Sequence, residues 1–185
     1  LALGFLFLEI FAIEKASLLL DDRASGFSLV LSTMLIFSGL GSFLSVRFAR
    51  APGRAVAIAV VVIALWAAGM LLLEPEVLGL GGASYGLRAG LVVLALAPVS
   101  IVMGLPFPLG LEQERSKFFL AWAWGLNGAF SVVATPLANL LLRQEGLHAV
   151  LGGAILMYGI AALSFPAPRR IQVWLSFMKR SAVAE

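Results

Sequence analysis

The sequence has no cysteine, a single histidine and few charged side chains, which make up 12% of its 185 residues. Without cysteine, the chain forms neither disulfide bonds nor thiolate-ligated zinc or iron–sulfur sites. Because His148 is the only histidine, a Ser–His–Asp or Cys–His catalytic set is not expected either. No Walker motif is present, and the sequence predicts no metal site, no cofactor and no catalytic residue.

Apolar residues are what the chain has in excess. They make up 61% of the sequence, compared with roughly 45–50% in soluble domains, and the mean hydropathy is +1.02. Several apolar runs approach the ~20 residues that cross a bilayer as a helix. We therefore expect an all-α polytopic membrane protein, with a transmembrane domain over residues 1–165 and a cytoplasmic tail over 166–185. The six predicted transmembrane helices are residues 1–20, 27–46, 55–73, 89–111, 118–142 and 149–165.

The positions of the basic residues predict which loops are cytoplasmic. Cytoplasmic loops of membrane proteins are enriched in Lys and Arg. Six spans with both ends inside give nine basic residues on the cytoplasmic side and only Arg23, Arg88 and Arg143 outside. The cytoplasmic set is Arg47, Arg50, Arg54, Arg115, Lys117, Arg169, Arg170, Lys179 and Arg180. The same asymmetry explains the net charge of +3, so nucleic-acid binding is not expected.

A proline-rich stretch interrupts the fourth apolar run. Pro106 and Pro108 lie between Gly104 and Gly110. A proline inside a helix removes a backbone hydrogen bond and clashes with the preceding turn. The sequence therefore predicts a helix break near Pro106, followed by a short charged hairpin.

Small residues at helical spacing indicate where helices pack closely. Pairs separated by four positions, such as Gly41 and Ser45, allow two helix backbones to approach in a membrane. We expect residues 27–46 and 118–142 to form the tightly packed centre. The predicted packing residues are Ser38, Gly39, Gly41, Ser42, Gly125, Gly128 and Ala129.

Glu9 and Asn127 are the candidate binding residues. A carboxylate near the middle of a membrane helix costs roughly 2.5–3.5 kcal/mol on insertion scales, so Glu9 is expected to face protein, water or a partner. One interpretation makes Glu9 a site for a cation or a proton. The favoured interpretation makes it a structural hydrogen-bonding group, bound to Asn127, to a serine or to a backbone amide freed at Pro106.

The C-terminal tail carries an amphipathic pattern. Ile171, Trp174, Leu175 and Met178 follow the spacing of one helical face, which predicts a helix in the cytoplasmic membrane interface. We favour a role as an anchor over a role as a partner-docking helix. The predicted anchoring residues are Arg169, Arg170, Trp174, Lys179 and Arg180.

Four stretches of the chain resemble a known family. They are LGFLFLEI at 3–10, LIFSGLGSFLS at 35–45, MGLPFPLGL at 103–111 and AWAWGLNGAFSVV at 121–133. Their order and spacing are similar to the C-terminal membrane half of bacterial spermidine synthase-like integral membrane proteins. The resemblance implies a location in the bacterial inner membrane and a soluble aminopropyltransferase-like domain before Leu1 or on another chain.

Three functions remain open. The leading hypothesis is a non-catalytic membrane module that serves as an anchor or an assembly subunit, with the bilayer and other membrane subunits or a soluble domain as partners. The second is binding or transport of a polyamine or small cation through Glu9 and the helix break at Pro106 and Pro108. The third is the membrane part of an aminopropyltransferase whose catalytic domain lies outside this chain.

Overall fold

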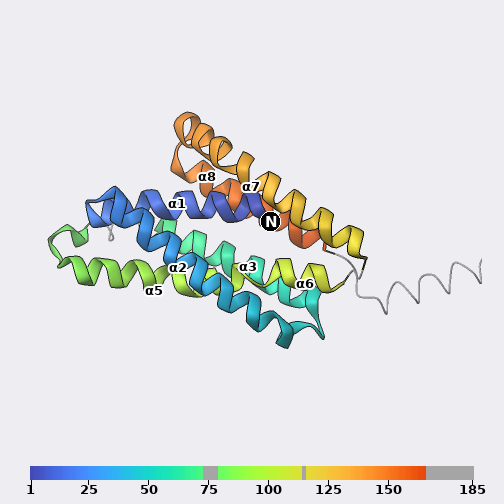
Figure 1. Ribbon diagram of the computed structural model, residues 1–185. Coiled ribbons are helices and arrows are strands. Elements are labelled where there is room, and N and C mark those ends of the chain that lie inside the picture. Colours follow the sequence, from blue (N-terminus) through green and yellow to red (C-terminus); the bar gives the residue numbers. More distant parts are fainter. Residues whose placement is uncertain (73–78, 114–115, 166–185) are drawn as a thin grey trace, which may run out of the picture.

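A computed structural model describes residues 1–72, 79–113 and 116–165, and every regular element in these residues is helical. The long helices run back and forth along a common direction (Figure 1). The α-helices are α1 (Ala2–Leu20), α2 (Arg23–Leu44), α3 (Pro52–Leu72), α5 (Tyr85–Met103), α6 (Pro106–Glu112), α7 (Lys117–Glu145) and α8 (Leu147–Leu163). Two short 3-10 helices, η1 (Ser45–Phe48) and η2 (Gly79–Gly82), complete the described elements.

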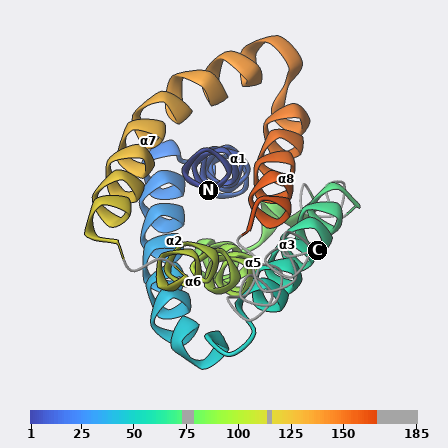
Figure 2. The same cartoon turned by 90° about the vertical axis from the view of Figure 1, so that its right-hand side faces the viewer.

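The first helix lies in the middle of the bundle. Seen end-on in Figure 2, α1 is surrounded by α7, α2, α5, α3 and α8. Every residue of α1 except Leu18 is buried or half-buried. Because α1 is enclosed on most sides, polar side chains near its middle meet protein instead of lipid.

Four of the described helical segments are long and apolar enough to cross a membrane. They are Arg23–Phe48, Pro52–Leu72, Tyr85–Glu112 and Phe118–Glu145. By the same measure α1 falls short because it carries Glu9, Glu14 and Lys15, and α8 falls short because it has 17 residues. The structure thus shows an all-helical protein with four helices of membrane-spanning character among the described residues.

Helix α2 begins at Arg23, earlier than residue 27, where the apolar pattern places its start. Asp21 ends α1 in the left-handed conformation, with φ 54°. The Asp22 carboxylate then accepts hydrogen bonds from the backbone N–H groups of Ala24 (3.3 Å) and Ser25 (2.9 Å). Such an N-cap satisfies backbone donors that the first helical turn leaves free. The connection between the two helices is consequently only Asp21 and Asp22, shorter than the gap of residues 21–26 between the predicted spans.

The closest helix crossing joins α2 to α5. A Cβ atom added to Gly41 would overlap the carbonyl group of Ile101, and one added to Gly104 would overlap the carbonyl group of Ser38. The predicted partner of residues 27–46 was instead the run 118–142, which forms α7. That helix packs against α1 and α8, so the tight centre lies between α2 and α5.

Two further glycines hold α8 against α1. A Cβ on Gly4 would lie 2.9 Å from Cδ2 of Tyr158, and a Cβ on Gly153 would lie 2.9 Å from Cδ2 of Phe7. Each glycine therefore leaves room for an aromatic ring of the neighbouring helix. Both rings are almost fully buried, which places a large part of the apolar core around α1.

Candidate functional site

Glu9 is one of four buried polar residues of the described chain. It is 7% exposed and projects from the central helix α1. In the described ranges, it takes part in no hydrogen bond and no ion pair. A lone carboxyl group in this position is available for a proton or a cation, but no second acidic side chain is buried beside it among the described residues.

The helix register places other polar groups near the level of Glu9. Gly26 of α2 packs against Ser17 of α1, with a would-be Cβ 2.8 Å from the Ser17 Cα atom. Counting along the antiparallel pair from this contact brings Glu9 to the level of Met34, which is next to the buried Thr33. Ser100 of α5 is fully buried, and its hydroxyl donates to the Leu96 carbonyl at 2.7 Å.

Asn127 does not join Glu9. It lines a pocket of about 250 Å³ at the other end of α1, together with Leu1, Ala2, Leu3, Phe107, Ala123, Leu126 and Phe130. Its backbone carbonyl accepts a hydrogen bond from Ser131 Oγ at 2.8 Å. The predicted hydrogen bond between Asn127 and Glu9 is absent from the described residues, because Asn127 lies beside the first three residues of the chain and not at the level of Glu9.

The expected helix break falls at Gly104 and Leu105. Pro106 is the first residue of α6, where its missing N–H costs no helical hydrogen bond. The Leu105 N–H donates to the Val102 carbonyl at 3.2 Å, which closes the last turn of α5. Beyond the break, Phe107 meets Trp124 of α7 edge to face, with ring centroids 5.0 Å apart.

Gly110 and the small residues of α7 make no close helix contact. A Cβ on Gly110 would lie at an ordinary 3.7 Å from the Phe165 ring, while Gly39, Gly125 and Gly128 have nothing within 4 Å of such an atom. Ala129 is exposed as well. The predicted interfacial anchors Arg169, Arg170, Trp174, Lys179 and Arg180 lie outside the described residues.

The bundle end that holds the α1–α2 turn carries ion pairs. Arg23 Nη2 lies 2.7 Å from Glu14 Oε1. Arg88 Nη1, from the start of α5, donates to Asp21 Oδ2 at 2.9 Å and to the Leu19 carbonyl at 2.8 Å. These bonds fasten the α1–α2 turn to α5. Hydrogen bonds from Ser25, first from its side chain and then from its backbone, and from the Ala24 N–H hold the pKa of Asp22 below its ordinary value.

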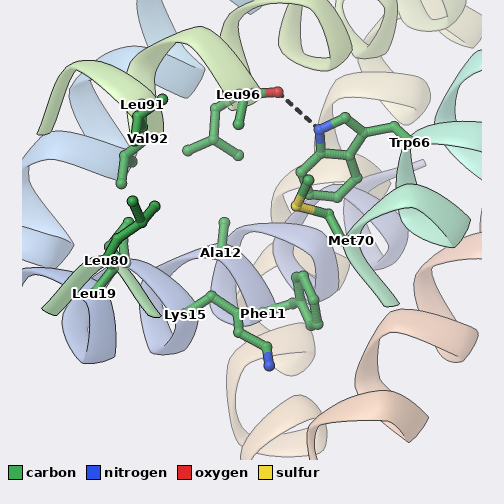
Figure 3. Close-up of a pocket in the computed structure, with 12 residues that line it drawn as sticks. Phe11, Ala12, Lys15, Leu19, Trp66, Met70, Leu80, Leu91, Val92 and Leu96 are labelled. Atoms are coloured by element: carbon green, nitrogen blue, oxygen red, sulfur yellow. Dashed lines mark hydrogen bonds between the residues drawn. The ribbon is translucent and has the colours of Figure 1, made fainter. Parts of the chain in front are cut away.

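An apolar pocket that sequence reasoning missed lies between α1, α3 and α5 (Figure 3). It has a volume of about 250 Å³. Trp66 of α3 lines it, and its Nε1–H donates to the Ala95 carbonyl of α5 at 2.7 Å. The pocket is hard to foresee from the sequence because the lining residues come from three distant apolar runs. The one sequence feature that could have indicated the pocket was Trp66, whose indole N–H needs a hydrogen-bond acceptor within an otherwise apolar run.

The described residues contain no group of three or more His, Cys, Asp or Glu side chains that could hold a metal ion. Comparison with protein-family models, with curated proteins and with solved structures finds no match. The resemblance to spermidine synthase-like membrane proteins therefore stays a prediction from the sequence motifs.

Proposed function

We propose that the chain crosses the bacterial inner membrane six times, with both ends in the cytoplasm. Helices α1 and α8 supply the two additional spans. The enclosure of α1 by its neighbours (Figure 2) accords with the burial of Glu9, and the 17 residues of α8 reach the short end of the ~17–25 residues that span a bilayer. The nine-to-three distribution of basic residues supports the orientation.

Within this membrane fold, we propose a non-catalytic role as an anchor or assembly subunit of a larger membrane complex. The supporting observation is the weak packing of α7. Of the side chains that the structure describes on α7, only Ala134 and Ala138 are buried. The first half of the helix exposes both tryptophans, Trp122 and Trp124, next to the small residues Gly125 and Ala129. Small residues on a membrane helix permit close approach by another helix, so this half of α7 is the proposed assembly face.

Site-specific crosslinking tests the assembly role. The chain has no cysteine, so single cysteines can be introduced at Gly125 and at Ala129 and labelled with a photoreactive maleimide in native membranes. We expect illumination to yield a discrete adduct of higher mass at both positions. Leu65→Cys on α3, which is 67% exposed, is the matched lipid-facing control and should give no discrete adduct.

Two outcomes would contradict the assembly role. One is a purified chain that remains a partner-free monomer in mild detergent, with no adduct from either α7 position. The other is an equal adduct yield from Leu65→Cys, which would show that crosslinking follows exposure to lipid and not a specific face of α7.

A second function, binding of a small cation or polyamine, is favoured by the burial of Glu9. In the described residues, Glu9 is 7% exposed and its carboxyl group has no cationic partner. A bound cation would supply the counter-charge that a carboxylate needs in a membrane interior. The break between α5 and α6 supports this function less directly, because the described pocket that contains Phe107 does not include Glu9.

Equilibrium binding of radiolabelled spermidine or sodium to the protein in nanodiscs tests this second function. Glu9→Gln should weaken binding by about tenfold or more, since removing one member of a buried charge pair is costly. Glu14→Gln is the matched control, because Glu14 already pairs with Arg23. Binding that is unchanged in Glu9→Gln would exclude the cation function.

A further inference from the structure

We propose that the pocket between α1, α3 and α5 is a binding site for one acyl chain of a membrane phospholipid. This inference rests on the membrane placement given above and goes beyond the assembly role. The pocket is lined by Phe11, Ala12, Lys15, Ala16, Leu19, Trp66, Met70, Leu80, Leu91, Val92, Ala95 and Leu96.

The lining offers a ligand almost nothing to hydrogen-bond. The indole N–H of Trp66 is already bonded to the Ala95 carbonyl. Lys15 contributes its aliphatic stem, while its ammonium group points away from the pocket (Figure 3). A polar ligand would leave its own groups unpaired in such a pocket, whereas a hydrocarbon chain would not. The chemistry of the lining therefore selects an uncharged, apolar occupant.

The shape of the pocket also fits a lipid chain. Its lining on α1 extends from Phe11 to Leu19, which is about 12 Å along the helix axis. Because α1 is proposed to cross the membrane, a pocket that extends along α1 lies roughly along the membrane normal, as acyl chains do. Phe11 and Ala12 form a buried floor, while Met70 and Leu91 on the walls are partly exposed. The partial exposure of Met70 and Leu91 leaves the pocket accessible from the surface of the bundle.

The charges at one end of the pocket suit the headgroup of the same lipid. Leu19 lines the pocket, and its carbonyl accepts a hydrogen bond from Arg88, which also pairs with Asp21. Groups of both signs thus lie beside the end of the pocket, and they match a zwitterionic headgroup better than one of a single charge sign.

Retention of a brominated lipid tests the site, because bromine on an acyl chain quenches nearby tryptophan fluorescence. A Trp66-only protein, with Trp122, Trp124 and Trp174 replaced by phenylalanine, is reconstituted in vesicles of phosphatidylcholine with brominated chains. The protein is then extracted into a detergent without bromine. We expect Trp66 to stay quenched after extraction. A Trp124-only protein, whose ring is 58% exposed, should be quenched in vesicles and should recover in detergent.

Substitutions that fill the pocket provide the second arm. Ala95→Phe and the milder Ala95→Leu should abolish the retained quenching of Trp66. Leu94→Phe, on the adjacent lipid-facing position that is 71% exposed, should leave the quenching unchanged. The elution volume in gel filtration shows whether each variant is folded. If the pocket variants do not fold, the comparison of Trp66 with Trp124 still tests the site, because it needs no pocket substitution.

The remaining outcomes are also decisive. If the fluorescence of Trp66 recovered in detergent to the same extent as that of Trp124, the proposed lipid site would be wrong. Mass spectrometry showing that native membranes leave only an anionic lipid, or an apolar molecule other than a phospholipid, in the protein would overturn the proposed occupant. Failure of the brominated vesicles to quench Trp124 would contradict the membrane placement itself, and it would be seen separately from any result at Trp66.

Discussion

Gly41 is the glycine at which an added methyl group should lower the stability of the protein most. A Cβ there would overlap the Ile101 carbonyl, which belongs to the rigid backbone of α5. We expect Gly41→Ala to lower the free energy of unfolding by about 1–3 kcal/mol, the range for overpacking a close-packed core. Thermal or denaturant unfolding in micelles measures the change. Gly39→Ala, where a Cβ meets nothing within 4 Å, is the control; equal losses in the two variants would contradict the α2–α5 crossing.

Asp22 should make the stability of the bundle depend on pH under acidic conditions. Hydrogen bonds from Ser25 and Ala24 lower its pKa from the ordinary 3.8. The unfolded chain therefore binds the proton more readily, so the contribution of Asp22 is complete above pH 3.8 and disappears as the pH falls through the lower, folded pKa. An asparagine side chain at this position keeps the cap without titrating, so Asp22→Asn should lose less stability than the wild type on acidification. Parallel pH dependences in unfolding experiments would contradict this role of the carboxylate.

Single residues also show how far sequence patterns reach. The spacing of small residues predicted close packing at Gly41 and at Gly125 alike, but only Gly41 lies at a helix crossing. A small residue gives a helix the capacity for close approach, and it does not identify the neighbour. The partner of Gly41 proved to be a stretch beside Gly104, which the sequence marked for a helix break and not for packing. The burial of Glu9 was expected from its cost in lipid, but its neighbours depend on tertiary contacts that periodicity does not contain.

At the scale of elements, two ion pairs at the same end of the bundle should differ in strength. The Arg88 side chain is 13% exposed and binds the Asp21 carboxylate, which is 77% exposed, and the Leu19 carbonyl in a part-buried hydrogen bond. Arg23 is 77% exposed and binds Glu14 alone. Hydrogen bonds to charged groups contribute about 1.5–3 kcal/mol when shielded, and exposed pairs contribute about 0–1 kcal/mol.

We therefore expect Arg88→Gln to lower the unfolding free energy by about 1–3 kcal/mol and Arg23→Gln to change it by less than about 1 kcal/mol. Denaturant unfolding of both variants in the same micelles makes the comparison direct. Hydrogen exchange at the start of α5 should accelerate in Arg88→Gln, because its link to the α1–α2 turn is lost. An effect of Arg23→Gln that equals or exceeds that of Arg88→Gln would show that this link does not hold α5 in place.

The apolar runs predicted the described helices well, and the differences lie at their ends. The run 55–73 became Pro52–Leu72, and 149–165 became Leu147–Leu163. Helix α2 started early because Asp22 caps it, a local signal that hydropathy alone overlooks. The apolar runs did not predict which helix lies at the centre of the bundle. Helix α1 carries three charged side chains, Glu9, Glu14 and Lys15. It nevertheless occupies the centre of the bundle, where all of its residues except Leu18 are buried or half-buried.

At the scale of the whole molecule, the six-span proposal predicts which loops share a side of the membrane. The α1–α2 and α7–α8 turns and η2 lie toward one end of the bundle, and the α2–α3 connection lies toward the other (Figure 1). Single cysteines at Ala24, Gly82 and Glu145 should then react with an impermeant maleimide from the periplasmic side of intact spheroplasts. Cysteines at Ala51 and Gln113 should react only after the membrane is opened.

The comparison between Ala24 and Ala51, which flank α2, does not by itself distinguish six spans from four. If α1 crossed no membrane and only the four most apolar helices did, α2 would still separate these two positions, so a C-terminal reporter fusion must be added. With α8 as a span, the C-terminus and Ala51 share the cytoplasmic side, and a fused alkaline phosphatase stays inactive because it folds only in an oxidising compartment. An active fusion would remove α8 from the spans. Protection of an N-terminal tag on the cytoplasmic side, together with an exposed Ala24, establishes α1 as a crossing; a tag on the side of Ala24 would exclude it.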